Sequence, residues 1–172
     1  MKKMSDNAEK KGISASPHSE DVTSVDAIIK AMYESVSFTA GSQPDYKRLR
    51  SLFHPEGRLI PPKTERDSSV HVLDVENFIT RSRDYVVITG LERRGFIEKE
   101  IFRRADGYGK IVHVLSTYES RHRETDPAPI QRGVNIIQLL KEHNRWWVVS
   151  VMWDIERPSV PIPPKYLPAD KV

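Results

Sequence analysis

Two side chains in this sequence could carry acid–base chemistry from an apolar setting. His113 lies in the run Ile111 to Leu115, and Tyr33 lies in a stripe of helically spaced apolar residues. A histidine titrates near neutral pH and can act as a general base or acid, and a tyrosine hydroxyl can donate to a carbonyl or oxyanion. We therefore take His113 and Tyr33 as candidate catalytic residues. The alternative, which is the commoner case for both residue types, is a hydrogen-bonded position in the core.

The residues around His113 predict the wall of a pocket. Alternate residues of a strand point to the same face, so Thr117 and Glu119 accompany His113, with Glu119 about 20 Å further along at roughly 3.3 Å per residue. The candidate ligand-binding residues, on this strand and the two that follow it, are Thr117, Glu119, Asn135, Trp147 and Trp153.

Several kinds of chemistry find no support in the sequence. There is no cysteine, and His122 with Glu119 and Arg121 lacks the further ligands that a metal site needs. No glycine-rich phosphate loop, Gly-x-Ser-x-Gly or His-Glu-x-x-His motif is present, so we expect neither a metal nor a cofactor. The 27 basic and 24 acidic residues are interleaved, which is typical of a solvated surface and predicts no nucleic-acid partner.

Four long strands must position these residues. The closing run Trp146 to Ile155 is wholly apolar on one of its alternating faces and mostly apolar on the other, which is typical of a strand covered on both sides. The segment Lys141 to Arg145 is short and polar, and Asp106-Gly107-Tyr108-Gly109 can form a tight reversal, so two hairpins are expected. The predicted strands form a meander and span residues 96–104, 110–122, 133–140 and 146–155.

Helices precede this meander. Ser24 or Thr23 can cap a helix that reaches Val36, Asp45 begins a second one that reaches Phe53, and Asp74 can cap a third over 75–87. Between them, His54 to Gly57 is expected to be a turn, Leu59-Ile60 a short edge segment before Pro61-Pro62, and 70–73 a brief strand. Helices segregated from an antiparallel sheet indicate an α+β fold, with the helices packed on one face of a bent sheet.

The two ends of the chain differ in composition from the rest. Residues 1–20 are polar and are expected to be a flexible tail, residues 21–157 a single domain, and residues 158–172 a proline-rich extension lying across the surface. No apolar h-region follows the N-terminal Met-Lys-Lys, and no stretch approaches the roughly 20 apolar residues that cross a bilayer. These features predict a cytoplasmic protein without a membrane partner.

The order of these segments resembles a known superfamily. The segments LFHPEGRLIPP, GFIEKEIFRRADGYGKIVHVLSTYESRH, RGVNIIQLL and RWWVVSVMWD, with helices before the first and second, resemble the SnoaL-like branch of nuclear-transport-factor-2-like proteins. The resemblance covers Val22 to Pro164. It implies a cone, a cystatin-like α+β roll in which a curved antiparallel sheet wraps around the N-terminal helices and encloses an apolar pocket. The register that best fits this resemblance turns the face of His113 inward, toward the pocket.

The resemblance allows two classes of function. One is an enzyme, a cofactor-free isomerase, dehydratase or cyclase acting on a small apolar, cyclic metabolite in the internal pocket; the other is a non-catalytic ligand-binding or oligomerisation module. Steroid-isomerase members have an acidic general base on the edge segment, where this chain has Leu59-Ile60-Pro61-Pro62. That mechanism is therefore not expected here, because none of these side chains can exchange a proton.

The outer face of the sheet predicts a homodimer. The helices can cover only one face, which leaves an apolar patch of Trp146, Val148 and Met152 with Val134 and Ile136 beside them. A second copy related by a two-fold axis would bury this patch twice. The competing cover is the proline-rich C-terminal segment, folded back within one chain.

Overall fold

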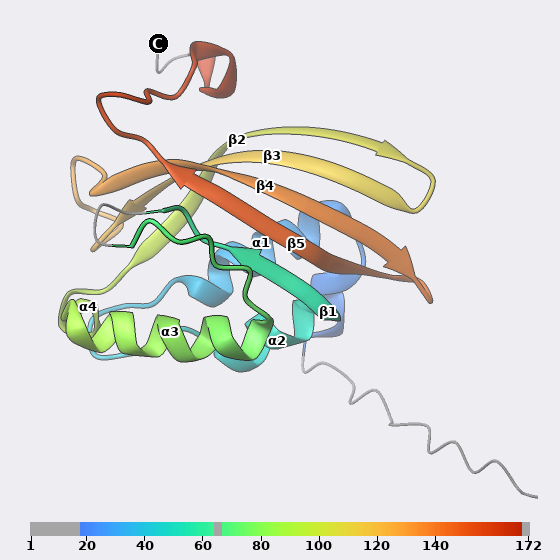
Figure 1. Ribbon diagram of the computed structural model, residues 1–172, viewed down its shortest axis with the longest axis horizontal. Coiled ribbons are helices and arrows are strands. Elements are labelled where there is room, and N and C mark those ends of the chain that lie inside the picture. Colours follow the sequence, from blue (N-terminus) through green and yellow to red (C-terminus); the bar gives the residue numbers. More distant parts are fainter. Residues whose placement is uncertain (1–17, 64–66, 170–172) are drawn as a thin grey trace, which may run out of the picture.

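The computed structural model describes residues 18–63 and 67–169 and contains one five-stranded sheet (Figure 1). Its order is β1-β5-β4-β3-β2, so the predicted antiparallel meander of β2 to β5 is confirmed. β1 pairs in parallel with β5 at the sheet edge. The strands are β1 (Phe53–Ile60), β2 (Ile97–Tyr108), β3 (Ile111–Arg121), β4 (Gln131–Glu142) and β5 (Arg145–Ile155).

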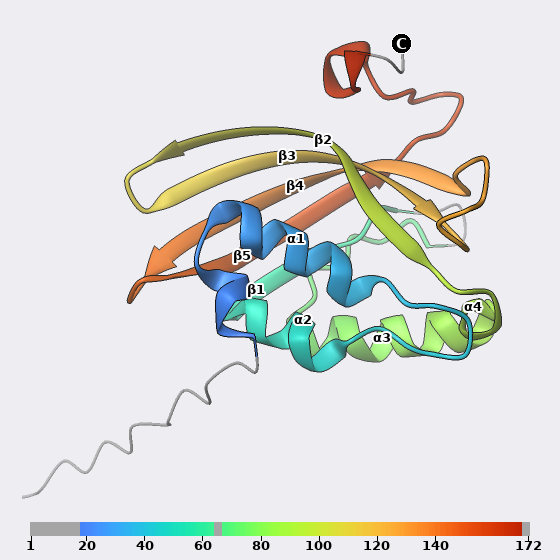
Figure 2. The same cartoon turned by 180° about the vertical axis from the view of Figure 1, so that it is seen from behind.

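The larger helices all lie on one side of the curved sheet (Figure 2). The described helices are η1 (Ser19–Val22), α1 (Val25–Val36), α2 (Tyr46–Leu52), α3 (Val75–Ile88), α4 (Leu91–Arg94) and η2 (Pro164–Tyr166). The predicted caps Ser24 and Asp74 are confirmed, and Asp45, which was predicted as the first residue of a helix, caps α2. Each of the three accepts a hydrogen bond from a backbone N–H in the first turn of its helix. The predicted flexible segment 1–20 lies outside the described residues up to residue 17, and η1 begins at Ser19.

The core fills the space between α1 and the inner face of the sheet. Ile28 and Ile29 of α1 and Val114, Ile137 and Val148 of the sheet are each 0% exposed. Burying side chains of this size stabilises the fold by about 1.5 to 3 kcal/mol each. The apolar stripe of α1 and the inward residues of β3, β4 and β5 therefore hold the helices against the sheet.

Two local predictions are wrong. His54 to Gly57 was expected to be a turn, but it belongs to β1, which begins directly after α2 and shifts register between Phe53 and Arg58. Residues 70–73 form no strand; Leu73 only bridges Leu59. The parallel pairing with β5 depends on contacts distant in sequence, which local propensity does not reveal.

A bulge in β5 changes which of its side chains point inward. The register with β4 shifts between Gln138 and Leu139, so Trp146 and Val148 join Val151 in the core. They were expected on the outer face by strict alternation, and that expectation is wrong because an extra residue in a strand reverses the faces beyond it. Met152 lies on the outer face as predicted and is 47% exposed.

Candidate functional site

The predicted site residues divide between the two faces of the sheet. Tyr33, Asn135 and Trp153 lie on the inner side, where Trp153 packs edge-on against Phe78 with ring centroids 6.1 Å apart. The side chains of Tyr33 and Asn135 meet, with Asn135 Nδ2 donating to Tyr33 Oη at 2.9 Å. The structure therefore brings together only this part of the predicted pocket wall.

His113 lies on the outer face, so the expectation that it points inward is wrong. Its Nδ1 is 2.8 Å from Nε2 of Gln138, on the exposed side of β4. The inner face of β3 instead carries Val114, Ser116 and Tyr118, all at most 2% exposed. Turning His113 inward would also turn the side chains of Glu119 and Arg121 toward the apolar core, which is unfavourable for charged groups.

Thr117, Glu119 and Trp147 also lie on the outer face, contrary to the prediction. Thr117 is 0% exposed because the C-terminal segment covers it, and its Oγ1 donates to the carbonyl oxygen of Tyr166 at 2.7 Å. Glu119 pairs with Arg121. The β5 bulge turns Trp147 outward, where the Arg145 guanidinium lies 3.4 Å from the centre of its ring.

A chain of hydrogen bonds links α1 to β2, β3 and β4 on the inner side of the sheet. Ser116 Oγ donates to the Glu100 carboxylate, which can only accept while it is ionised and paired with Arg103. Since Ser116 has one hydroxyl proton, Tyr33 Oη must donate to Ser116 Oγ, 2.6 Å away. Tyr33 in turn accepts from Asn135. The chain therefore runs from Asn135 through Tyr33 and Ser116 to Glu100, and the Tyr33 proton is already engaged.

An open groove of about 530 Å³ lies between α1 and β2, where the chain of hydrogen bonds ends at Glu100. Three of its lining residues are uncharged, namely Tyr33, Ser37 and Ile97, and the others are charged. They are Lys30, Glu34, Glu98, Lys99, Glu100, Arg103 and Glu124.

The cations of the groove are paired with carboxylates of the same groove. Lys99 lies 3.1 Å from Glu124, and Arg103 makes hydrogen bonds of 2.6 to 3.0 Å to Glu100. Lys30 lies 3.7 Å from Glu34, one turn along α1. Within residues 18–63 and 67–169, no cation is within ion-pairing distance of the remaining carboxylate, that of Glu98.

Glu98 is the carboxyl group of the groove whose pKa burial raises most clearly. Desolvation by the surrounding protein raises the pKa of Glu98 to about 7, against the lowering effect of a long hydrogen bond of 3.4 Å from Ser120 Oγ. Its backbone is fixed by Ser37, whose Oγ accepts from Glu98 N at 2.9 Å and lies 3.2 Å from Glu98 O. Burial and the nearby Glu98 also raise the pKa of Tyr33 and of Tyr118.

Sequence reasoning missed Glu98 and Glu100. They stand two apart in the run Phe96 to Phe102, so they share one face of β2, and with Lys99 they form a charged triplet that has two apolar residues on each side. The signal was present, but it is also typical of a solvated edge strand. Only the packing of α1 against β2 distinguishes the two cases, by placing Tyr33 and Ser37 over that face.

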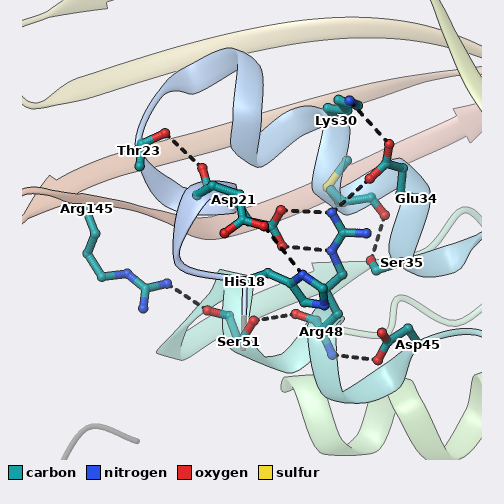
Figure 3. Close-up of polar contacts among 12 residues, drawn as sticks. His18, Asp21, Thr23, Lys30, Glu34, Ser35, Asp45, Arg48, Ser51 and Arg145 are labelled. Atoms are coloured by element: carbon teal, nitrogen blue, oxygen red, sulfur yellow. Dashed lines mark hydrogen bonds and ion pairs between the residues drawn. The ribbon is translucent and has the colours of Figure 1, made fainter. Parts of the chain in front are cut away.

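A second charged cluster joins the first helices and has a different character (Figure 3). Arg48 of α2 donates to both carboxylate oxygens of Asp21, at 2.7 and 2.8 Å, and to Glu34 of α1 at 2.8 Å. The bonds to Asp21 raise the pKa of Arg48 further above its usual range. Since Asp21 and Glu34 both accept from the same guanidinium, this cluster holds η1, α1 and α2 together.

Among the described residues, no helix is long and apolar enough to cross a membrane, and no three His, Asp or Glu side chains gather as metal ligands would. No protein-family model matches the sequence, and no curated protein is significantly similar to it.

Solved structures do resemble the chain. An NTF2-like protein of unknown function from Silicibacter pomeroyi is 15% identical, with a TM-score of 0.54, over 76% of this chain and 92% of that one. An NTF2-like protein with a cystatin-like fold from Novosphingobium aromaticivorans is 10% identical, with a TM-score of 0.53, over 67% and 73%. A protein of unknown function with a cystatin-like fold from Nostoc punctiforme is 16% identical, with a TM-score of 0.50, over 69% and 81%. At these identities the likeness concerns the fold: the chain has the cystatin-like α+β fold of NTF2-like proteins.

Proposed function

We propose that this protein binds a small molecule in the groove between α1 and β2 and exchanges a proton with it through Glu98. The observation that supports this is the pairing pattern of the groove. Its cations are engaged by Glu34, Glu100 and Glu124, while the Glu98 carboxylate has no cation and titrates near neutral pH.

A carboxyl group with a pKa of about 7 is suited to acid–base catalysis. At neutral pH it is present in both forms, so it can remove a proton from one atom of a ligand and return it to another. Such a transfer needs no cofactor and corresponds to the isomerase, dehydratase or cyclase class. Glu98 takes the role for which His113 was considered.

The groove favours a ligand that is more polar than the predicted apolar metabolite. Seven of its ten lining residues are charged, while the interior of the cone is filled by the core side chains of α1 and the sheet. A small cyclic ketone or lactone fits this chemistry, because its ring can contact Tyr33 and Ile97 while its acidic C–H faces Glu98.

The test compares the unchanged protein with Glu98→Gln and with Glu56→Gln, whose side chain is 79% exposed on β1 at the other sheet edge. A panel of cyclic ketones and lactones is screened for a rise in melting temperature, and binders are assayed for exchange of their α-protons with deuterated water. We expect exchange in the unchanged protein and in Glu56→Gln, with a loss of at least 100-fold in Glu98→Gln. Exchange that survives in Glu98→Gln would contradict the proposal.

A second candidate is the non-catalytic ligand-binding module, favoured by the filled interior and the openness of the groove. In this case compounds raise the melting temperature but no proton exchange occurs. A bound ligand at 100 times its Kd stabilises the protein by about 2.7 kcal/mol whether or not it reacts. The same experiment therefore separates the two functions.

A further inference from the structure

Two hairpin turns project beyond the helices at one end of the sheet (Figures 1 and 2). One joins β2 to β3 and the other joins β4 to β5. The turns lie side by side, because the backbone N–H of Lys141 donates to the carbonyl oxygen of Lys110 at 2.7 Å. The C-terminal segment leaves β5 at the opposite end of the sheet (Figure 1). We call residues 104–111 and 140–147 the hairpin end.

A row of apolar side chains crosses the hairpin end. The strand registers align Tyr108, Ile111, Leu140 and Trp147 across β2, β3, β4 and β5. Tyr108 is 86% exposed and Ile111 is 58% exposed. Single exposed apolar residues are common on proteins, but adjoining ones mark a surface that contacts a partner.

The hairpin end also carries cations that the protein does not neutralise. Lys110 is exposed, the Lys141 ammonium lies 5.9 Å from the centre of the Trp146 ring, and the Arg145 guanidinium lies over Trp147. Among the residues that the structure describes, none of these three cations has a carboxylate within ion-pairing distance. Their charges are therefore available to an anionic partner.

The carboxylates of the hairpin end are fewer than its cations. They are Asp106, which lies 4.0 Å from Arg104, and Glu142, which lies 3.8 Å from His143. Residues 104–111 and 140–147 contain four Lys or Arg but only these two acidic residues. The hairpin end is therefore positively charged.

Tyr, Trp and Ile beside Lys and Arg suit the boundary between water and lipid. Apolar side chains enter the headgroup region there, and cations meet the anionic headgroups. We infer that the hairpin end binds the surface of a membrane that contains anionic lipids. Nucleic acid is also anionic, but Ile111 offers no ring on which a base could stack, whereas lipid accepts any apolar side chain.

This contact differs from the sequence-based expectation of a protein without a membrane partner, which considered segments that span a bilayer. A surface contact requires no such segment. It is also independent of the proton exchange proposed for Glu98. Glu98 and Tyr108 lie near opposite ends of β2, so roughly 30 Å separate them at the rise of an extended strand.

The experiment measures co-sedimentation of the full chain with lipid vesicles. One set of vesicles contains only phosphatidylcholine, and the other contains equal parts of phosphatidylcholine and phosphatidylglycerol. We expect the protein to sediment with the anionic vesicles and to remain in solution with the neutral ones.

The contribution of charge is tested with Lys110→Glu. Each charge near an anionic surface changes the affinity about fivefold, so reversing one charge should weaken binding about 25-fold. Lys47→Glu on α2 is the matched control, since Lys47 is also exposed. We expect little effect from this control, because charges further from the lipid than the Debye length of ~8 Å are screened.

The contribution of the apolar row is tested with Tyr108→Ser and Ile111→Ser in one chain. Both side chains are exposed, so the fold should persist, while binding to anionic vesicles should weaken at least tenfold. The matched control is Tyr85→Ser with Ile88→Ser on α3, where the side chains are 61% and 83% exposed. This control should bind as the unchanged protein does.

Several results would overturn the inference. They are a full chain that ignores anionic vesicles, equal binding to both kinds of vesicle, and hairpin-end variants that bind as well as their controls. A full chain that binds a single-stranded oligonucleotide but no vesicles would also overturn it, since the partner would then be a nucleic acid.

Discussion

Tyr33 has one hydroxyl proton, and its neighbours determine where that proton points. Because Ser116 gives its own proton to Glu100, it can only accept from Tyr33. A ligand in the groove therefore meets the ring of Tyr33 and not a free hydroxyl donor. Tyr33 was a candidate for catalysis from the sequence, and the hydrogen bonds favour a structural role beside Glu98.

Tyr33→Phe keeps the ring and removes only the hydroxyl group. Asn135 then loses the acceptor of its hydrogen bond and Ser116 loses its donor, both in buried positions. We expect the free energy of unfolding to fall by about 1 to 3 kcal/mol in urea denaturation. Tyr85→Phe is the matched control, since Tyr85 is 61% exposed and its change should have almost no effect. If the two variants were equally stable, the hydrogen bonds of Tyr33 would contribute nothing to the stability of the fold.

At the scale of single elements, Arg48 connects three helical segments through Asp21 and Glu34. Arg48→Met would leave the Asp21 side chain, which is 6% exposed, as a buried charge without its partner. We expect a loss of about 2 to 4 kcal/mol in the free energy of unfolding. Removing one partner of a buried ion pair leaves the other charge buried and unpaired, which costs more than the intact pair contributes to stability.

Arg50→Met provides the control for this loss. Arg50 pairs with Glu76 in a setting where both side chains are about half exposed. Exposed pairs contribute at most about 1 kcal/mol, so this variant should unfold nearly as the unchanged protein does. If Arg48→Met were as mild as Arg50→Met, the cluster would be a surface feature and not the link between η1, α1 and α2.

Sequence patterns predicted which residues form helices and strands better than they predicted which face of each strand points inward. Ser24, Asp45 and Asp74 marked helix starts because a cap is a local interaction. The inward face of β3 was assigned from a resemblance and not from its residues, although Val114 and Tyr118 are better suited to a core than His113 is. The bulge in β5 has no local signal, and it alone decides that Trp146 is inside and Trp147 outside.

For the whole molecule, the α+β cone could be predicted because the order of helices and strands is encoded segment by segment. The groove could not, since it arises where α1 and β2, far apart in sequence, come together. The raised pKa of Glu98 could not be predicted for the same reason, because the burial that raises it exists only in the complete fold.

The raised pKa of Glu98 makes the stability of the molecule depend on pH. The folded state holds this proton up to about pH 7, whereas the unfolded chain releases it near the ordinary value of 4.5. The contribution of Glu98 to stability is therefore lost as the pH rises from 4.5 to 7. We expect Glu98→Gln to be more stable than the unchanged protein at pH 8 by up to about 3 kcal/mol, given about 1.4 kcal/mol per pKa unit, and to show no such gain at pH 4. If the free energies of unfolding of the two proteins differed by the same amount at pH 4 and at pH 8, the pKa of Glu98 would not be raised.

The most direct test is the titration of the Glu98 carboxyl carbon by NMR in protein labelled with ¹³C, with Glu98→Gln used to assign the resonance. We expect a midpoint near pH 7, well above the ordinary value of 4.5. A midpoint near 4.5 would mean that Glu98 is an ordinary ionised carboxylate at neutral pH, and it would contradict the assignment of Glu98 as the proton-exchanging group of the groove.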